Sequence, residues 1–272
     1  MDKEVILLRH FEDANIAEDY RDEDISEVGL ETLESIAEII QINLEKTGCT
    51  SIILFSSPLK RSTETGQLIA DTLEAEGVKT ETIQDERLCS LKHGKYKPSD
   101  IDALNTAEHD AWLAFVDQSI NKQNIFYRHG DPLVQGDKVE YPSLVGEFIG
   151  YGESQLEFTI RTYSFLVDLM SEYDKNRCEG KMVLICSHMA PLMRLHELSN
   201  LAKYGSNLAE APGKMYINEW NQIGEVAQDD NAKNIMKTGG IGILDIEILM
   251  KRKDEISSEL AFLQFLYSQS IS

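Results

Sequence analysis

The stretch EVILLRHFED, residues 4–13, begins as a buried β-strand and ends on groups that carry chemistry. Four aliphatic residues lead directly into Arg9 and His10. A short, continuous apolar run of this kind is typical of a parallel strand that is buried on both faces. Phe11 follows, a bulky ring at a turn where a chemical site would need space.

Further apolar strands alternate with helical patterns along the chain. CTSIILFSS (49–57) and KMVLICSH (181–188) predict two more buried strands, and GGIGILDIEIL (239–249) predicts a late one. VKTETIQ (78–84) is typical of a short edge strand. Helical patterns lie between them, at residues 26–46, 59–77, 154–175 and 190–202. Apolar strands separated by helices indicate an α/β fold with a mostly parallel sheet covered on both faces.

The pattern predicts a single domain of residues 1–272 with one insertion. Residues 99–120 look helical, whereas residues 121–154 have no clear period and carry several Gly and Pro, which is typical of a long loop. We therefore expect an inserted lid over about residues 92–152. A helix over about residues 253–268 follows, and its apolar stripe fits either a core contact or a homodimer contact.

The acidic composition excludes some classes of partner. The chain has 47 acidic and 26 basic residues and a net charge of −21, so its surface as a whole repels nucleic acid and anionic membranes. It shows neither a long apolar run nor a basic region ahead of one, so we expect no membrane span and no signal peptide. Four cysteines at scattered spacing match no zinc pattern, which predicts reduced thiols in a cytoplasmic protein.

Three of the predicted strands end in arginine or histidine side chains. The first ends in Arg9 and His10. The second leads into a helix that begins near Arg61, and the third ends in His188. Because ligands of open α/β sheets bind outside the carboxyl ends of the strands, we expect these four side chains to meet at one edge of the sheet.

Two arginines and two histidines suit a tetrahedral oxyanion such as a phosphate group. Arginine presents a planar pair of donors that matches phosphate oxygens. A neutral histidine attacks phosphorus through one nitrogen when a hydrogen bond holds the other nitrogen protonated. The remaining groups would neutralise charge on the phosphate oxygens, so we expect no metal and no other cofactor.

The motifs around these residues resemble signatures of the histidine phosphatase (phosphoglycerate mutase-like) superfamily. LLRHFEDA (7–14) resembles its Arg-His-Gly signature. FSSPLKRSTETGQLIA (55–70) is similar to its Ser-Ser-Pro-Leu-x-Arg segment and is the most specific match. LICSHMAPLMRL (184–195) resembles the strand of its second histidine. Weaker similarities occur at residues 24–37 and 150–166.

The resemblance runs in family order over about residues 4–195 and implies a three-layer α/β/α fold. It implies that His10 is the nucleophile that accepts the phosphoryl group. Arg9, Arg61 and His188 would form the phosphate pocket, and a carboxylate would protonate the leaving oxygen.

The sequence departs from the family pattern beside both histidines. Phe11 and Met189 stand where the family has glycine, and the glycine after the catalytic histidine normally lets the chain turn close to the phosphate. Asn15, the candidate for the family's phosphate-contacting asparagine, lies one residue short of its usual position. The ring of Phe11 must point away from the phosphate or form an apolar wall beside it.

The general acid is the most serious departure. When ERLCSLKHGKY is aligned on Leu88 and Gly94, the acid position falls on Ser90. We take Glu153 as the candidate acid, and two alternatives stay open. Either Glu86 reaches the site after a register shift, or the chain has no strong acid and only good leaving groups react quickly. Loss of a general acid typically costs a factor of about 10²–10⁴ in rate.

These features predict a metal-independent phosphatase that hydrolyses a phosphomonoester through a phosphohistidine on His10. Its substrate would be a phosphorylated small molecule or a phosphoprotein, selected by the lid. Two alternatives stay open. One is a catalytically impaired family member that binds a phosphate ligand or a protein as a regulator, and the other is a mutase of the phosphoglycerate type.

Overall fold

The structure, a computed structural model, describes most of the chain in two compact units. It covers residues 4–13, 24–92, 95–98, 113–121, 124–128, 131, 133–135, 138–140, 146–149, 152–204 and 230–271. Unit 1 consists of Met1–Ser90 with Thr162–Leu260, and unit 2 consists of Leu91–Arg161 with Ala261–Ser272. The single domain with an inserted lid stays a prediction.

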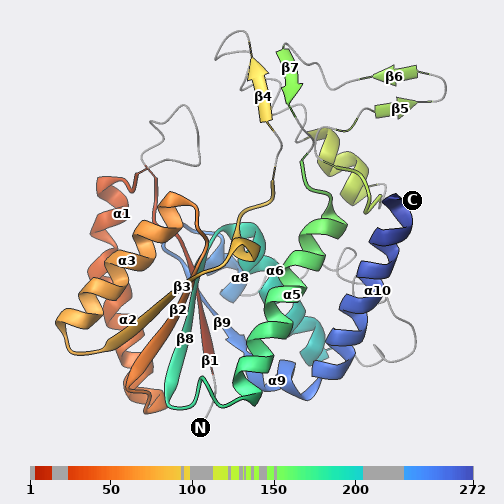
Figure 1. The fold of residues 1–272 in the computed structure, drawn as a ribbon. Helices are drawn as coiled ribbons and strands as arrows, with labels where there is room; N and C mark the ends of the chain where they lie inside the picture. The colour runs from red at the N-terminus through yellow and green to blue at the C-terminus, as the bar shows by residue number, and fades with distance from the viewer. Residues whose placement is uncertain are drawn as a thin grey trace. The chain divides into compact units, whose positions relative to one another are not determined.

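Within the described residues, unit 1 contains a five-stranded sheet (Figure 1). In the order in which they pair, its strands are β3 (Lys79–Gln84), β2 (Ser51–Ser56), β8 (Lys181–Ser187), β1 (Glu4–Arg9) and β9 (Ile241–Asp245). Strands β1, β2, β3 and β8 run parallel, and β9 pairs antiparallel with β1. The apolar runs therefore form strands, and the mostly parallel sheet is confirmed. The strand predicted over residues 239–249 was too long, because Asp245 caps a helix that begins at Ile246.

The register of the central strands brings their carboxyl ends together. Arg9 at the end of β1 lies beside Ser187 on β8. Ser56 at the end of β2 lies beside Cys186 on β8. The residues that directly follow these three strands therefore leave the sheet at the same edge, where α/β folds bind their ligands.

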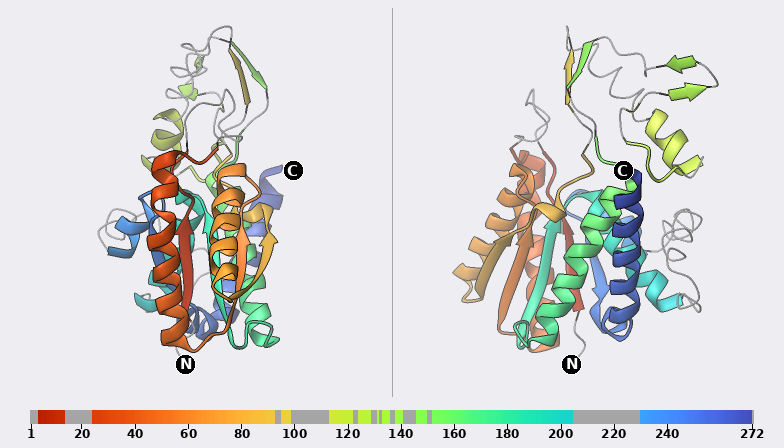
Figure 2. Two further views of the ribbon diagram at one scale, coloured as in Figure 1. Left: turned by 90° about the vertical axis from the view of Figure 1, so that its left-hand side faces the viewer. Right: turned by 45° about the vertical axis from the view of Figure 1, so that its right-hand side comes forward.

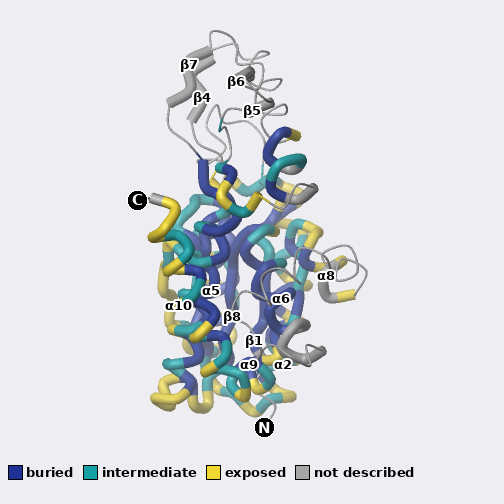
Figure 3. The backbone as a smooth tube through the Cα atoms, turned by 90° about the vertical axis from the view of Figure 1, so that its right-hand side faces the viewer, coloured by how far each residue is buried: buried dark blue, intermediate teal, exposed yellow. Residues whose placement is uncertain are grey.

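Helices cover both faces of this sheet, as the views in Figure 2 show. Outside the insertion, the described residues form the helices α1 (Glu27–Glu31), α2 (Leu33–Thr47), α3 (Lys60–Ala75), the 3₁₀ helix η1 (Glu86–Leu88), α5 (Gln155–Asp174), α6 (Met189–Tyr204), α8 (Asp230–Ile235), α9 (Ile246–Lys251) and α10 (Lys253–Ile271). On one face, α2 and α3 share a hydrophobic cluster with β1, β2 and β8. On the other face, Phe165 of α5 meets Phe55 of β2. The buried strands between two helical layers give the α/β/α arrangement (Figure 3).

The helix predicted over residues 26–46 is divided into α1 and α2. Ser26 is the N-cap, as predicted, because its hydroxyl accepts a hydrogen bond from the Gly29 amide at 3.0 Å. Thr32 ends α1, since its hydroxyl donates to the Gly29 carbonyl, and α2 begins at the next residue. At Gly29 a Cβ would lie 2.7 Å from the Glu12 carbonyl oxygen, so α1 packs closely against the turn that follows β1.

Unit 2 contains short paired strands, and β5, β6 and β7 lie where the sequence predicted a long loop. Strand β4 (Lys95–Pro98) pairs with β7 (Gly146–Ile149), and β5 (Leu133–Gln135) pairs with β6 (Lys138–Glu140), both antiparallel. The π-helix η2 (Val116–Asn121) lies in the stretch that the sequence predicted to be helical. The part of that stretch before residue 113 lies outside the described residues.

The apolar stripe of α10 is buried within the chain at Ile256, Leu260 and Leu263. This burial fits a core helix, and the homodimer contact stays a prediction. In the part of the chain that the structure describes, no helix combines the length and the apolar character needed to cross a membrane.

Candidate active site

Backbone hydrogen bonds hold the end of β1 from both sides. The His10 amide donates to the Ser187 carbonyl at 2.8 Å, and the Gly239 amide donates to the His10 carbonyl at 3.0 Å. Gly239 has a φ of 68°, and a Cβ on Gly240 would lie 1.7 Å from the Asn234 carbonyl oxygen, so both positions require glycine. The backbone of His10 is therefore fixed by β8 on one side and by the turn before β9 on the other.

His10 is buried, with 4% of its surface exposed, and its ring is held in one tautomer. Its Nδ1 lies 2.7 Å from the Phe11 carbonyl oxygen. Because a carbonyl can only accept, Nδ1 carries the proton and the lone pair is on Nε2. Burial, followed by the positive charge of Arg61, lowers the pKa of His10 to about 4, so the ring is neutral at pH 7. This is the form in which a histidine attacks phosphorus.

His188 follows the neighbouring strand β8 and faces His10. The two ring centroids lie 5.0 Å apart, with an angle of 55° between the planes. The Nε2 atom of His188 lies 3.0 Å from the Ser57 hydroxyl. That hydroxyl also accepts a hydrogen bond from the Leu59 amide at 3.3 Å and lies 3.7 Å from the Cys89 sulfur. Ser57 thereby orients the second histidine beside the first.

Arg9 and Arg61 add two positive charges beside His10. Arg61 lies in the first turn of α3 and is 8% exposed. Burial and then the charge of Arg61 lower the pKa of Arg9. The Nη1 of Arg9 donates to the Met236 carbonyl, and its buried Nε has no hydrogen-bond partner among the described residues. An anion that accepts from these guanidinium groups would offset the cost of holding like charges together.

Phe11 is fully buried, and its ring packs in the hydrophobic cluster under α2 and α3. A Cβ on Gly239 would lie 3.3 Å from the ring, so the ring also fills the space beside the turn before β9. The Phe11 amide donates to the Thr65 hydroxyl at 3.0 Å, which joins this turn to α3. The ring of Phe11 therefore belongs to the core, whereas the side chain of Met189 is exposed at the start of α6.

Ser90 and Glu86 lie in the segment that follows β3. Ser90, at the position where the resemblance expects the acid, is half-buried. Glu86 is exposed on η1, and its Oε2 accepts from the Cys89 thiol at 3.6 Å. The Cys89 sulfur in turn lies 3.7 Å from the hydroxyl of Ser57. Glu86 thus reaches the neighbourhood of His188 only through two intervening side chains.

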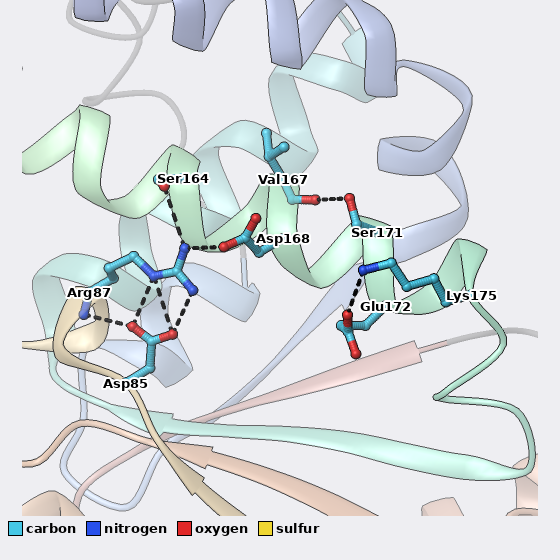
Figure 4. A network of polar contacts seen from close by, with 8 residues as sticks. All are labelled: Asp85, Arg87, Ser164, Val167, Asp168, Ser171, Glu172 and Lys175. Carbon is cyan, nitrogen blue, oxygen red and sulfur yellow. Dashed lines mark hydrogen bonds and ion pairs between the residues drawn. The ribbon is translucent and has the colours of Figure 1, made fainter.

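An ion-pair network fixes this segment against α5 (Figure 4). The guanidinium of Arg87 lies 2.7 Å from the carboxylate of Asp85 and 2.5 Å from that of Asp168. Hydrogen bonds to Asp85, the largest cause, raise the pKa of Arg87. A cavity of about 450 Å³ opens beside the network, and its lining includes none of the four side chains predicted to bind phosphate. The network holds η1 in place and is not the predicted phosphate pocket.

Glu153 lies in unit 2 and pairs with an arginine. Its carboxylate accepts hydrogen bonds from the Nε of Arg161 at 2.8 Å and from its Nη2 at 2.7 Å. The Glu153 amide also donates to the Lys92 carbonyl at 2.7 Å. Both carboxylate oxygens are thereby engaged by one guanidinium. The role of Glu153 as general acid stays a prediction.

Asp13 is a carboxylate near His10 that the sequence reasoning missed. Its Oδ2 lies 3.9 Å from the Nε of Arg61, and its charge acts on both Arg9 and His10. The sequence does show an acidic residue in the turn directly after a strand that ends in Arg9 and His10, and this position could have indicated a role for Asp13. Asn15, the predicted phosphate contact of the same turn, lies outside the described residues.

A comparison with protein families agrees with the motifs. Residues 5–131 match the sequence model of the histidine phosphatase superfamily (branch 1), slightly less than half of the chain. Over these residues the chain matches the superfamily that its motifs resemble. A search of curated proteins finds no match.

Solved structures with a similar fold include phosphatases and a mutase. A mycobacterial glucosyl-3-phosphoglycerate phosphatase in complex with VO3 is 16% identical, with a TM-score of 0.46 over 73% of this chain and 81% of that chain. A mutant phosphoserine phosphatase from Entamoeba histolytica, in complex with phosphoserine, is 17% identical, with a TM-score of 0.45 over 88% of each chain. A phosphoglycerate mutase from Bacillus anthracis is 18% identical, with a TM-score of 0.42 over 74% and 82%. Likeness at this level does not inform the substrate of this chain.

Proposed function

We propose that this chain is a phosphatase that hydrolyses a phosphomonoester through a phosphohistidine on His10. The observation that carries the proposal is the state of His10, a buried neutral ring whose Nδ1 donates to the Phe11 carbonyl. Arg9, Arg61 and His188 supply donors for the phosphate oxygens. The buried Nε of Arg9, which has no hydrogen-bond partner among the described residues, supports this role.

The reaction divides into two displacements at phosphorus. In the first, the lone pair of Nε2 of His10 forms the P–N bond while the P–O bond to the leaving group breaks, and the leaving oxygen keeps the electron pair. The Nδ1 hydrogen bond to Phe11 stabilises the positive charge that develops on the ring. The two guanidinium groups stabilise the equatorial oxygens. In the second, water attacks phosphorus, the electrons of the P–N bond return to Nε2, and phosphate leaves.

The substrate class in this proposal is a phosphorylated small molecule or a phosphoprotein. A net charge of −21 disfavours highly charged anions, which favours a substrate with a single phosphate group. All four cysteines are free thiols, which suits a reducing compartment, and we place the activity in the cytoplasm.

A second candidate function is favoured by the carboxylates. Ser90 stands at the acid position, and both oxygens of Glu153 accept from Arg161. A chain that binds phosphate but has no proton donor would hydrolyse only esters with good leaving groups, or would act as a phosphate-binding regulator.

Radiolabelling with phosphorus separates these functions. Wild-type protein quenched during turnover of labelled p-nitrophenyl phosphate should carry an acid-labile, alkali-stable phosphoryl group, and His10→Ala should carry none. The matched control is His196→Ala, which removes a buried histidine of α6 and should keep the label. If neither p-nitrophenyl phosphate nor a panel of phosphorylated metabolites gives label or turnover while phosphate still binds, the phosphatase proposal is wrong and the binding function stands.

A further inference from the structure

Asp13 has no part in the reaction described so far, although it brings a negative charge to the end of β1. Its Oδ2 lies 3.9 Å from the Nε of Arg61, and its side chain is 19% exposed. Its charge opposes the effects of burial on Arg9 and His10. An ionised carboxylate in a pocket that would bind an anion weakens that binding, and a proton on the carboxyl group removes the repulsion.

The backbone around Asp13 is fixed by the segment that leads into α1. Asp13 forms an antiparallel bridge with Ile25. The Ser26 amide donates to the Glu12 carbonyl at 2.8 Å, and the close approach of Gly29 keeps that carbonyl in place. The position of the carboxyl group beside Arg61 is thus set by the fold.

The charges that face Asp13 do not suit a phosphate dianion. Arg9 on β1 and Arg61 on α3 are positive, and His10 is neutral at pH 7 with its pKa at about 4. His188, after β8, lies against the ring of His10, with 5.0 Å between the two ring centroids. When Asp13 is ionised, Arg9, Arg61 and Asp13 together carry one net positive charge that can attract the ligand. A phosphate dianion beside this carboxylate would place like charges together, which favours the uptake of one shared proton.

The other carboxylates that the sequence suggested are engaged elsewhere. Glu86 is exposed and accepts from the Cys89 thiol. Glu153 accepts from both arms of the Arg161 guanidinium. The 3.9 Å separation between Asp13 and Arg61 is beyond the length of a hydrogen bond, so Asp13 is not held in a comparable fork.

We propose that Asp13 is the proton donor of this pocket, protonated when a phosphate group binds beside it and giving that proton to the leaving oxygen. The proposal rests on the phosphatase function proposed above. Asp13, in the turn after β1, would supply the carboxyl group that is missing at Ser90.

The proton balance closes over the two displacements. As the P–N bond forms and the P–O bond breaks, the leaving oxygen keeps the electron pair and takes the proton of Asp13, so a neutral alcohol leaves. The resulting carboxylate then takes a proton from the attacking water while the electrons of the P–N bond return to Nε2. Asp13 ends protonated, and water is the only co-reactant.

Leaving-group dependence tests the donor role. Asp13→Asn should lower kcat by a factor of about 10²–10⁴ for an alkyl phosphate, whose leaving oxygen needs a proton. For p-nitrophenyl phosphate, whose leaving group departs as an anion, the same variant should lower kcat by about tenfold at most. The matched control is Glu12→Gln, which changes the adjacent exposed carboxylate and should alter neither rate. An equal loss on both substrates would show that Asp13 is not the donor.

Proton uptake tests the same claim without turnover. Calorimetric titration of wild type with inorganic phosphate at pH 7.5, in two buffers of different ionisation enthalpy, should show uptake of a proton that Asp13→Asn does not take up. Uptake near zero in wild type contradicts the proposal even if the variant does not fold. Unequal uptake without turnover of any phosphomonoester would support the protonation of Asp13 and overturn the phosphatase function instead.

Discussion

Two charged sites, one in each unit, are built on opposite principles. At the end of β1, the fold holds Arg9 and Arg61 close enough that the second lowers the pKa of the first. At the start of α5, Glu153 and Arg161 are opposite charges at hydrogen-bond distance. With the carboxylate of Asp13 beside them, the two arginines keep a net positive charge that a bound anion would offset. The charges of Glu153 and Arg161 already balance each other.

This difference predicts how substitutions divide between stability and activity. Changes in the Glu153–Arg161 pair should cost stability and leave the chemistry at His10 in place. Changes in the cationic pocket should cost activity and little stability, because its native arrangement is not optimal for folding.

Phe11 provides the largest expected effect on stability, because its ring is fully buried in the core. Phe11→Ala should lower the free energy of unfolding by about 4 kcal/mol. Phe11→Leu fills most of the same volume and should cost less than about 1.5 kcal/mol. Urea denaturation measures both. If Phe11→Leu keeps its stability but changes the ranking of substrates, the ring lines the pocket and is not only packing.

Arg61→Ala should lower kcat for p-nitrophenyl phosphate by a factor of about 10²–10³, because one oxyanion donor is lost. Arg61→Lys keeps the charge but not the planar fork, and should recover only part of the rate. Steady-state kinetics measures both variants. If Arg61→Lys recovers the full kcat, charge alone matters at this position. If Arg61→Ala keeps the wild-type kcat, Arg61 does not take part in the reaction.

Glu153→Gln should lower the free energy of unfolding by about 3 kcal/mol, since it leaves the guanidinium of Arg161 without its buried partner. The matched control is Glu81→Gln, in the more exposed pair with Lys181, which should cost about 1 kcal/mol at most. Denaturant midpoints and kcat are compared for both. A fall in kcat of about 10² or more at unchanged stability would make Glu153 the general acid after all.

The smallest effect is a pH dependence of stability that comes from His10. Its folded pKa of about 4 is below its ordinary value of 6.5, so the unfolded chain binds more protons between these values. The stabilisation from neutral His10 is therefore present above pH 6.5 and is lost as the pH falls toward 4. From pH 7 to pH 5 the loss should be about 2 kcal/mol. Urea denaturation of wild type and His10→Asn at pH 7 and pH 5 isolates the contribution of His10. If the free energy of unfolding changes equally with pH in both proteins, the pKa of His10 is not depressed.

Much of unit 1 could be predicted from sequence because its signals are local. Buried parallel strands are continuous apolar runs, and strands that run parallel must end at one edge, which is why the sequence alone groups Arg9, His10, Arg61 and His188. The N-cap at Ser26 is equally local, since it depends on a hydroxyl three residues before its donor.

The remaining features depend on contacts between distant segments. The strands of unit 2 have three or four residues each, too few to show a period. The direction of the Phe11 ring is set by the cluster under α2 and α3, not by its neighbours in the sequence. Asp13 could not be assigned because its relation to Arg61 exists only once β1 and α3 are packed together.

The central claim is that Nε2 of His10 is the atom that attacks phosphorus, and a crystal structure with vanadate bound tests it most directly. Vanadium should be bonded to Nε2 of His10, with its oxygens held by Arg9, Arg61 and His188, and the carboxyl group of Asp13 should lie near the apical oxygen opposite Nε2. Vanadate bound away from the end of β1, or facing Nδ1 with the hydrogen bond to the Phe11 carbonyl broken, would rule out attack by Nε2.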